Sequence, residues 1–200
     1  MYMTYLDEVI QIPFMGKNEI ASRVEELLSE CWDGFFPVDV EKLCDRLGIA
    51  ILPVTKLADS FRIDAFISAD FKTIYVDADK YRYESYRYRF SVAHELGHYI
   101  LHKEYFSSRV GSFEEWQGLS DDKLGRVAEF QANYFAGCLL APEDELLRAL
   151  NTKFGGSFAR NYFGTGRSEI AGILVDIQKL FNVSGQVVGR RIQDIAYGLS

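Results

Sequence analysis

The feature that most constrains this chain is the pentapeptide HELGH at residues 94–98. In a helix, residues four apart lie on the same face one turn from each other, so the imidazoles of His94 and His98 can converge on one metal ion. Glu95 points to the adjacent side of the helix, where it can act on a water molecule instead of binding the metal. All three histidines of the chain lie within residues 94–102, which is not typical of ordinary core histidines. The pattern predicts a helix that binds one zinc ion per chain; the alternative is a helix whose histidines bind no metal.

A zinc site of this kind needs a third protein ligand and keeps one position for water or substrate. His102 continues the spacing, but it lies about 12 Å along the helix axis from the first histidine at a rise of about 1.5 Å per residue. This distance favours a supporting or packing role for His102 over direct coordination. Glu104 fits the longer HExxHxxGxxH pattern poorly, because a leucine stands where that pattern has glycine. Glu114 and Glu115 could reach the metal only from a loop.

Glu129 is the third ligand that we favour. Its face of a predicted helix carries the small residues Gly125, Ala132 and Ala136. Small side chains let this helix approach the helix of residues 94–98 closely enough for a short carboxylate to reach the metal. One turn further on, Asn133 is expected to accept a hydrogen bond from a ligand imidazole and so fix its tautomer. The alternative for Glu129 is a carboxylate that binds no metal.

Two ordered motifs stand in the second half of the chain: RFSVAHELGHYILH at residues 89–102 and EFQANYFAGCLLAP at residues 129–142. Shorter matching stretches lie upstream, at residues 37–39, 43–49 and 72–77. Together these stretches resemble the ImmA/IrrE family of zinc metallopeptidases over about residues 20–199. Two motifs in this order and at this separation are far more specific than the HExxH pattern alone.

The resemblance implies a function as well as a site. It gives His94, His98 and Glu129 as ligands of one zinc ion and Glu95 as the catalytic base. Better-understood members of the family cleave a partner repressor that carries an XRE-type helix-turn-helix, so the implied activity is a zinc endopeptidase acting on such a repressor. Two alternatives stay open: a DNA- or repressor-binding regulator or toxin component that uses the same fold without proteolysis, and a zinc hydrolase of a small substrate.

Peptide hydrolysis also needs a group that stabilises the oxyanion. No histidine is left outside the helix that carries the metal ligands, so a tyrosine or an arginine must provide this group if a side chain does. The candidate tyrosines are Tyr99, Tyr134 and Tyr162.

The periodicity of apolar residues predicts an α+β fold. Helical spacing occupies residues 17–31, 38–47, 84–102, 120–141, 143–150, 168–180 and 184–199, with Gly48 as a helix cap. Short β-like runs occupy residues 49–54, 62–68 and 73–77. We expect a small, mainly antiparallel sheet with a hairpin, packed on a zincin-like helical core. The candidate edge strand for pairing with an extended substrate comprises Thr73, Ile74, Tyr75 and Val76.

The chain divides into a metallopeptidase domain at residues 1–150 and a linker with a C-terminal helical subdomain at residues 151–200. The apolar pattern of the last two helices resembles a helix-turn-helix. Residues 146–200 hold seven basic and three acidic side chains, although the whole chain carries a net charge of −7. A DNA reader places polar side chains early in its second helix, whereas Arg190 and Arg191 come late. We therefore favour packing or docking of a protein substrate over direct DNA binding.

Composition limits where such a chain can work. Its three cysteines are widely spaced, which predicts neither a disulfide framework nor a thiolate metal site. A content of 48% hydrophobic and 26% charged residues excludes a disordered chain. No stretch reaches the about 20 apolar residues that a membrane span needs, and the first residues lack the pattern of a signal peptide. We expect a cytoplasmic protein.

Overall fold

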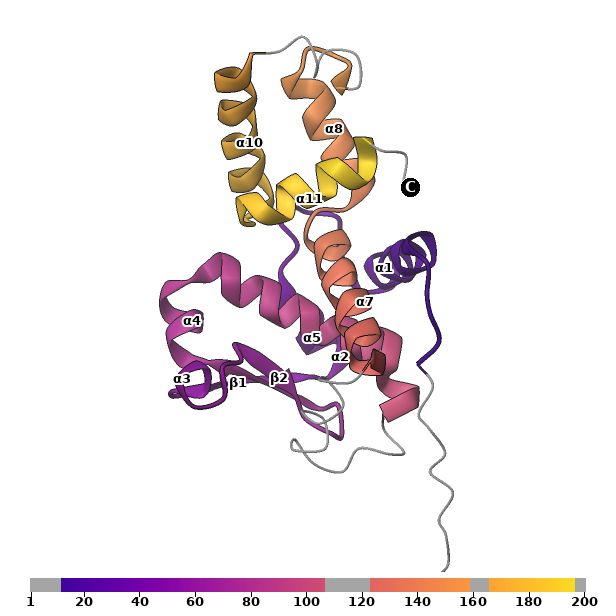
Figure 1. The fold of residues 1–200 in the computed structure, drawn as a ribbon, viewed down its shortest axis with the longest axis vertical. Coiled ribbons are helices and arrows are strands. Elements are labelled where there is room, and N and C mark those ends of the chain that lie inside the picture. The colour runs from indigo at the N-terminus through magenta and orange to yellow at the C-terminus, as the bar shows by residue number, and fades with distance from the viewer. Residues whose placement is uncertain (1–11, 107–122, 159–165, 197–200) are drawn as a thin grey trace, which may run out of the picture.

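The computed structural model describes residues 12–106, 123–158 and 166–196, and it confirms the α+β class (Figure 1). Its helices are α1 (Lys17–Cys31), α2 (Val40–Leu47), α3 (Leu57–Phe61), α4 (Ala78–Tyr83), α5 (Ser85–Phe106), α7 (Lys123–Leu140), α8 (Glu143–Lys153), α10 (Arg167–Phe181) and α11 (Gly185–Ala196). Its strands are β1 (Ala50–Val54), β2 (Ala65–Ile67) and β3 (Thr73–Asp77). Among these described helices, none combines the length and the apolar character that a membrane crossing requires.

The sheet has the strand order β1-β3-β2. β1 is parallel to β3, with Ala50 opposite Thr73, whereas β2 and β3 form the expected antiparallel hairpin. The sheet is therefore mixed, and not mainly antiparallel as we expected. A tight turn after β1 would place β2 beside it as an antiparallel neighbour. The connection through α3 instead leaves the position beside β1 to β3, and β3 runs parallel to β1.

The prediction of an edge strand at Thr73, Ile74, Tyr75 and Val76 is wrong. These residues belong to β3, which is paired on both sides and is the central strand. The edges of the sheet are β1 and β2, and β2 is the edge strand that packs against α5. The sequence marks which segments are extended, but it does not show which of them become neighbours.

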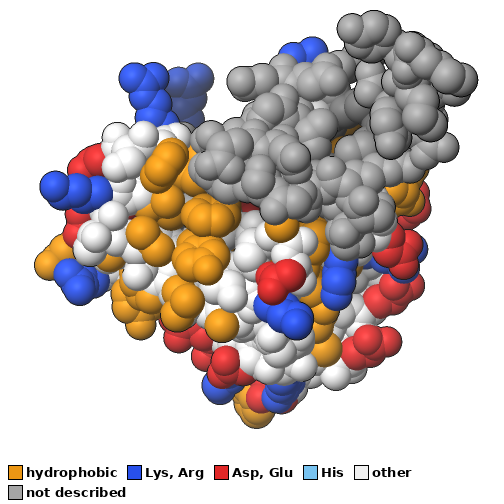
Figure 2. All heavy atoms as spheres, turned by 90° about the horizontal axis from the view of Figure 1, so that it is seen from below, with side chains coloured by type: hydrophobic (Ala, Val, Ile, Leu, Met, Phe, Trp, Pro, Cys, Tyr) orange, Lys and Arg blue, Asp and Glu red, His pale blue; other side chains and the backbone are white. Residues whose placement is uncertain are grey.

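One face of the sheet is buried and the other is open. Ile74 and Val76 of β3 and Ile67 of β2 are buried among the core residues. On the other face, the rings of Phe66 and Tyr75 stack with centroids 4.9 Å apart, and the neighbouring Leu52 is half-exposed. Figure 2 looks at the molecule from this side and shows hydrophobic side chains gathered there. The buried face is the one that positions β2 against α5.

The helices form two groups, as Figure 1 shows: α5 crosses α7 above the sheet, while α8, α10 and α11 lie together at the other end. Arg89 ties the groups together, because it donates hydrogen bonds to the carbonyls of Val38 (2.8 Å) and Asn182 (3.1 Å). α10 and α11 confirm the two predicted C-terminal helices. The expected domain boundary at residue 150 falls inside α8, and both that division and the helix-turn-helix likeness stay predictions.

Local sequence signals explain several helix ends. Asp39 caps α2 by accepting hydrogen bonds from the backbone N–H groups of Glu41 and Lys42, and Gly48 ends that helix in the left-handed conformation, as predicted. The short helices α3 and α4 were not expected, because five or six residues give too little periodicity to recognise. The predicted helix start at Ser120 lies outside the described residues.

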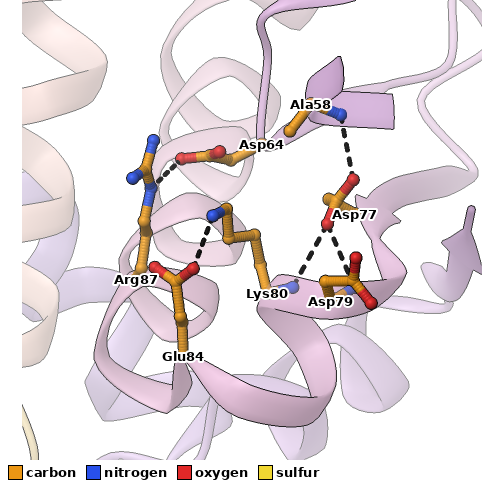
Figure 3. A network of polar contacts seen from close by, with 7 residues as sticks. All are labelled: Ala58, Asp64, Asp77, Asp79, Lys80, Glu84 and Arg87. Carbon is orange, nitrogen blue, oxygen red and sulfur yellow. Dashed lines mark hydrogen bonds and ion pairs between the residues drawn. The ribbon is translucent and has the colours of Figure 1, made fainter. Parts of the chain in front are cut away.

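Asp77, at the end of β3, joins three elements (Figure 3). Its Oδ1 accepts the N–H groups of Asp79 (3.0 Å) and Lys80 (3.2 Å) in the first turn of α4, and its Oδ2 accepts the N–H of Ala58 in α3 (2.9 Å). Burial alone would raise the pKa of Asp77, but these three donors lower it overall. Asp64 and Arg87 form an adjacent ion pair that holds the start of β2 to α5.

We predict that Asp77→Ala lowers the free energy of unfolding by about 1–2 kcal/mol, because it removes a helix cap and the tether to α3. The measurement is chemical denaturation at neutral pH, with Asp79→Ala as the matched control, since the Asp79 side chain is exposed. A group whose pKa is lowered by folding loses its contribution as the pH falls. The difference between wild type and Asp77→Ala should therefore shrink below the ordinary carboxyl pKa of 3.8. Equal stability of wild type and Asp77→Ala at neutral pH would contradict this account.

Candidate functional site

The site is built where α5 and α7 cross at very short range. A Cβ atom added to Gly97 of α5 would lie 3.0 Å from Cα and 3.2 Å from the carbonyl oxygen of Ala132 in α7. Ala132 and Ala136 are fully buried at this contact. The small-residue face of α7 thus allows the close approach that the sequence predicted.

His94, His98 and Glu129 meet at this crossing, and their ligand atoms all lie within 4.8 Å of one another. The two Nε2 atoms are 3.0 Å apart, and the carboxylate oxygens of Glu129 lie 3.2 Å from His94 Nε2 and 3.3 Å from His98 Nε2. Ligand atoms placed about 2.1 Å from one tetrahedral ion are about 3.4 Å apart, so these spacings fit a shared zinc ion. Two imidazoles and one carboxylate are also a donor set that catalytic zinc uses. The structure brings together the three side chains that were predicted from the sequence.

The protonation states of His98 and Glu129 favour metal binding at this cluster. Burial lowers the pKa of His98 to about 4, so its imidazole is neutral at neutral pH. Burial would raise the pKa of Glu129, but its contacts with the two histidines lower it overall, so this carboxylate is ionised. His94 shows the opposite balance: burial lowers its pKa, and the hydrogen bond with Glu129 raises it overall. A neutral imidazole beside an ionised carboxylate is the state that a metal ion requires.

Glu95 is buried beside the cluster and is not one of its three members. Its Oε2 accepts a hydrogen bond from the backbone N–H of Ile67 in β2 at 2.9 Å. The N–H of Ser68 bonds to Thr73 in β3, so by the alternation of an antiparallel pair the N–H of Ile67 points away from β3 and toward α5. Burial raises the pKa of Glu95 to about 7. The contact with Ile67 was not predicted, because a side-chain contact to a strand backbone has no signal in the sequence.

A chain of buried hydrogen bonds lies behind His98. The Nδ1 atoms of His98 and His102 are 3.0 Å apart, and His102 Nε2 is 2.8 Å from Oε1 of Gln131. Gln131 Nε2 in turn donates to the carbonyl oxygen of Pro13 at 3.0 Å. His102 thus lies behind a ligand and outside the three-residue cluster, where we expected it. Gln131 was not predicted from the sequence, although it stands two residues after Glu129 and is fully buried.

Asn133 contacts the other histidine. Its Nδ2 donates to the carbonyl oxygen of Glu129 at 2.7 Å, and its side chain also forms a hydrogen bond with His94. Because the amide nitrogen is used by Glu129, the amide oxygen is the atom that accepts from the imidazole. This is the contact predicted for Asn133; its effect on the tautomer of His94 stays a prediction.

Of the other candidate ligands, the one that the structure describes, Glu104, does not join the cluster. Glu104 is exposed on α5, and Glu114 and Glu115 lie outside the described residues. Burial raises the pKa of the free thiols of Cys44 to about 12 and of Cys138 to about 11, so neither is a thiolate at neutral pH.

The candidate oxyanion tyrosines have other contacts. The Tyr99 ring packs near Phe71 and beneath the ammonium group of Lys103, 4.5 Å from the ring centroid. The ring of Tyr134 lies beneath Lys17, at 5.3 Å, and beside the guanidinium of Arg191. Tyr162 lies outside the described residues.

A groove of about 1040 Å³ opens next to the cluster, between α5, α7 and α11. Asn133, which contacts His94, is part of its lining, as are the partly exposed aromatic rings of Tyr86 and Phe130. α11 supplies the opposite wall, including the exposed Arg190.

Arg191, the neighbour of Arg190 on α11, has a packing role. It is 2% exposed, and its Nε donates to the carbonyl oxygen of Ala141 at 3.1 Å. A guanidinium that is buried in this way contributes little to a DNA-binding surface.

Comparison with known proteins gives a family match for most of the chain. Residues 44–193, which include all three members of the cluster, match the family described as Peptidase M78, IrrE N-terminal-like domain. No curated protein matches the chain at a significant level.

We predict that Gly97→Ala weakens zinc binding about tenfold or more, because the added methyl group pushes α7 away from α5 and moves Glu129 relative to the histidines. Competition with a chromogenic chelator measures the affinity. Gly172→Ala is the matched control, since nothing lies within 4 Å of a Cβ at that helical position. The control should keep full zinc affinity and gain about 0.5–1 kcal/mol of stability. Unchanged zinc affinity in Gly97→Ala would show that the crossing does not set the site.

Proposed function

Because residues 44–193 match its family model, the chain belongs to the ImmA/IrrE peptidase family, and we propose on this basis that it is a zinc-dependent endopeptidase with one zinc ion per chain. The observation that carries the proposal is the meeting of His94, His98 and Glu129 with ligand atoms about 3 Å apart. These three residues would hold the metal.

When bound, a zinc ion supplies Lewis-acid chemistry that acidifies a water molecule and polarises a peptide carbonyl. Glu95 is the proposed base, which takes the proton of the attacking water and passes it to the nitrogen of the leaving amine. Its Oε2 is fixed by the N–H of Ile67, which leaves Oε1 to carry the proton. A carboxyl group with a pKa of about 7 can both accept and release a proton near neutral pH.

The exposure of the three ligands supports access from one side. The His98 side chain is 1% exposed, the His94 side chain 14% and the Glu129 side chain 36%. The cluster is thus closed behind His98 and open on the side of Glu129. This is the side on which Phe130 and Asn133 line the groove. A substrate in the groove would therefore approach the ligands from their open side.

We propose that the substrate is a protein, namely a repressor with an XRE-type helix-turn-helix. The resemblance of the motifs at residues 89–102 and 129–142 supports this choice. The groove is compatible with it, because its volume of about 1040 Å³ lies at the upper end of the range of about 300 to 1,000 Å³ that small-molecule pockets span. Since a repressor acts on DNA inside the cell, the proposed location is the cytoplasm.

If the substrate also pairs with the sheet, we propose that it pairs with β2. This strand is an edge of the sheet and lies beside α5, so its outward backbone groups face the region of Glu95. An extended chain added at such an edge gains main-chain hydrogen bonds without a fixed sequence. The N–H of Ile67 is already used by Glu95, so pairing would use the remaining outward groups of β2.

The direct test is Glu95→Gln, assayed on a repressor with an XRE-type helix-turn-helix. We expect zinc to bind as in wild type, since Glu95 is not in the ligand cluster, and cleavage to fall by about 10²–10⁴-fold because the base is lost. Glu104→Gln, exposed on the same helix, should cleave normally. Unchanged cleavage by Glu95→Gln would exclude the proposed mechanism. Zinc-independent DNA binding by a wild type that cleaves nothing would favour the non-proteolytic regulator.

A second test concerns the groove. Tyr86→Ala removes an aromatic ring from its wall, so we expect KM for the protein substrate to rise about tenfold with little change in kcat. Tyr83→Ala is the matched control, because Tyr83 is 78% exposed and does not line the groove. A normal KM in Tyr86→Ala, or an equal rise in both variants, would show that the substrate does not use this groove.

A further inference from the structure

The proposed mechanism uses only the Nε2 atom of His98, yet the Nδ1 atom of this ring begins a hydrogen-bonded chain. The chain runs through His102 and Gln131 and ends at the backbone carbonyl of Pro13, with lengths of 3.0, 2.8 and 3.0 Å. His102 and Gln131 are fully buried, and His98 is 1% exposed. Polar groups this deeply buried need their partners, so the direction of each bond can be worked out.

The direction is set at the Pro13 end. A carbonyl oxygen can only accept, so the atom of Gln131 that faces Pro13 must be its NH₂ group. The other end of the amide, Oε1, is then an acceptor that faces Nε2 of His102. His102 must therefore carry a proton on Nε2.

The proton on His102 in turn sets the proton on the metal ligand. His102 is fully buried, and its two nitrogens face an amide oxygen and a second imidazole and not a carboxylate, so a neutral ring is favoured, with its single proton on Nε2, where Gln131 accepts it. Nδ1 of His102 then carries no proton and has a lone pair. It must therefore accept a hydrogen bond from the N–H group at Nδ1 of His98. A neutral His98 with its proton on Nδ1 has a lone pair on Nε2, the atom that faces His94 and Glu129.

We propose that the carbonyl of Pro13, acting through Gln131 and His102, fixes the tautomer of His98 so that its Nε2 is ready to bind zinc before the ion arrives. Gln131 and His102 are positioning residues for this ligand. The segment before α1 is part of the metal site, although Gln131 and Pro13 are 118 residues apart. The effect on zinc affinity rests on the proposed function as a zinc endopeptidase, whereas the tautomers of the metal-free protein do not.

The N-terminal segment is held firmly enough for this role. Ile12 and Met15 on either side of Pro13 are each 7% exposed and belong to the hydrophobic core. The helix that follows, α1, packs on α7, which carries Gln131. The acceptor and the donor are therefore fixed to the same part of the core.

The first experiment reads the tautomers of the metal-free protein from long-range ¹H–¹⁵N NMR correlations of the histidine rings. We expect the proton on Nε2 of His102 and on Nδ1 of His98. A proton on Nδ1 of His102 would overturn the inference. Because this measurement needs no metal, the expected tautomers in a protein that fails to bind zinc would refute the proposed function and leave the inference standing.

The second experiment uses Gln131→Met, which keeps the length of the side chain but can neither accept from His102 nor donate to Pro13. We expect a mixture of His102 tautomers and a zinc affinity lower by about 10–100-fold, as for other partners of metal-bound histidines. Ile177→Val, a fully buried position in α10, is the control: it should lower the melting temperature without changing tautomers or zinc affinity. Wild-type tautomers and zinc affinity in Gln131→Met would overturn the inference. If Gln131→Met fails to fold, the wild-type tautomers decide.

Discussion

The crossing of α5 and α7 is the constraint on which the rest of the structure depends. Gly97 and Ala132 let the two backbones approach to a distance that no larger side chain permits. The ligands lie within a turn of this contact, with His98 next to Gly97 and Glu129 three residues before Ala132. The distance between imidazoles and carboxylate is therefore a consequence of helix packing, and the sheet and the outer helices serve to hold this crossing in place.

Around this crossing, each buried polar group is oriented by a different part of the chain. Glu95 is held by the backbone of β2, and Gln131 by the segment before α1. Burying such groups without partners would cost several kcal/mol, so these contacts are needed for stability as well as for chemistry. The ionised carboxylate of Glu129 beside the neutral imidazole of His98 suits a divalent cation. The hydrogen bonds that stabilise these buried polar groups thus also hold the site in a state that can bind a metal ion.

Short-range patterns made the ligands predictable. His94 and His98 follow from helical spacing, Glu129 from the small residues on its face, and the helix end at Gly48 from its need for a left-handed residue. Long-range contacts were not predictable: the central position of β3 has no signal in its own residues, because strand pairing depends on segments that are distant in sequence. The contact of Glu95 with Ile67 spans 28 residues, and that of Gln131 with Pro13 spans 118 residues. Both involve a backbone atom, and because every residue has the same backbone groups, the residue types do not indicate such contacts.

The central claim, that two histidines and one glutamate from crossing helices hold a catalytic zinc ion, is tested most directly by anomalous X-ray diffraction at the zinc edge on crystals of the zinc-loaded protein. The account predicts one strong peak about 2.0–2.2 Å from Nε2 of His94, Nε2 of His98 and a carboxylate oxygen of Glu129. A zinc ion coordinated by His102 or Glu95, or one bound away from the crossing of α5 and α7, would contradict this account.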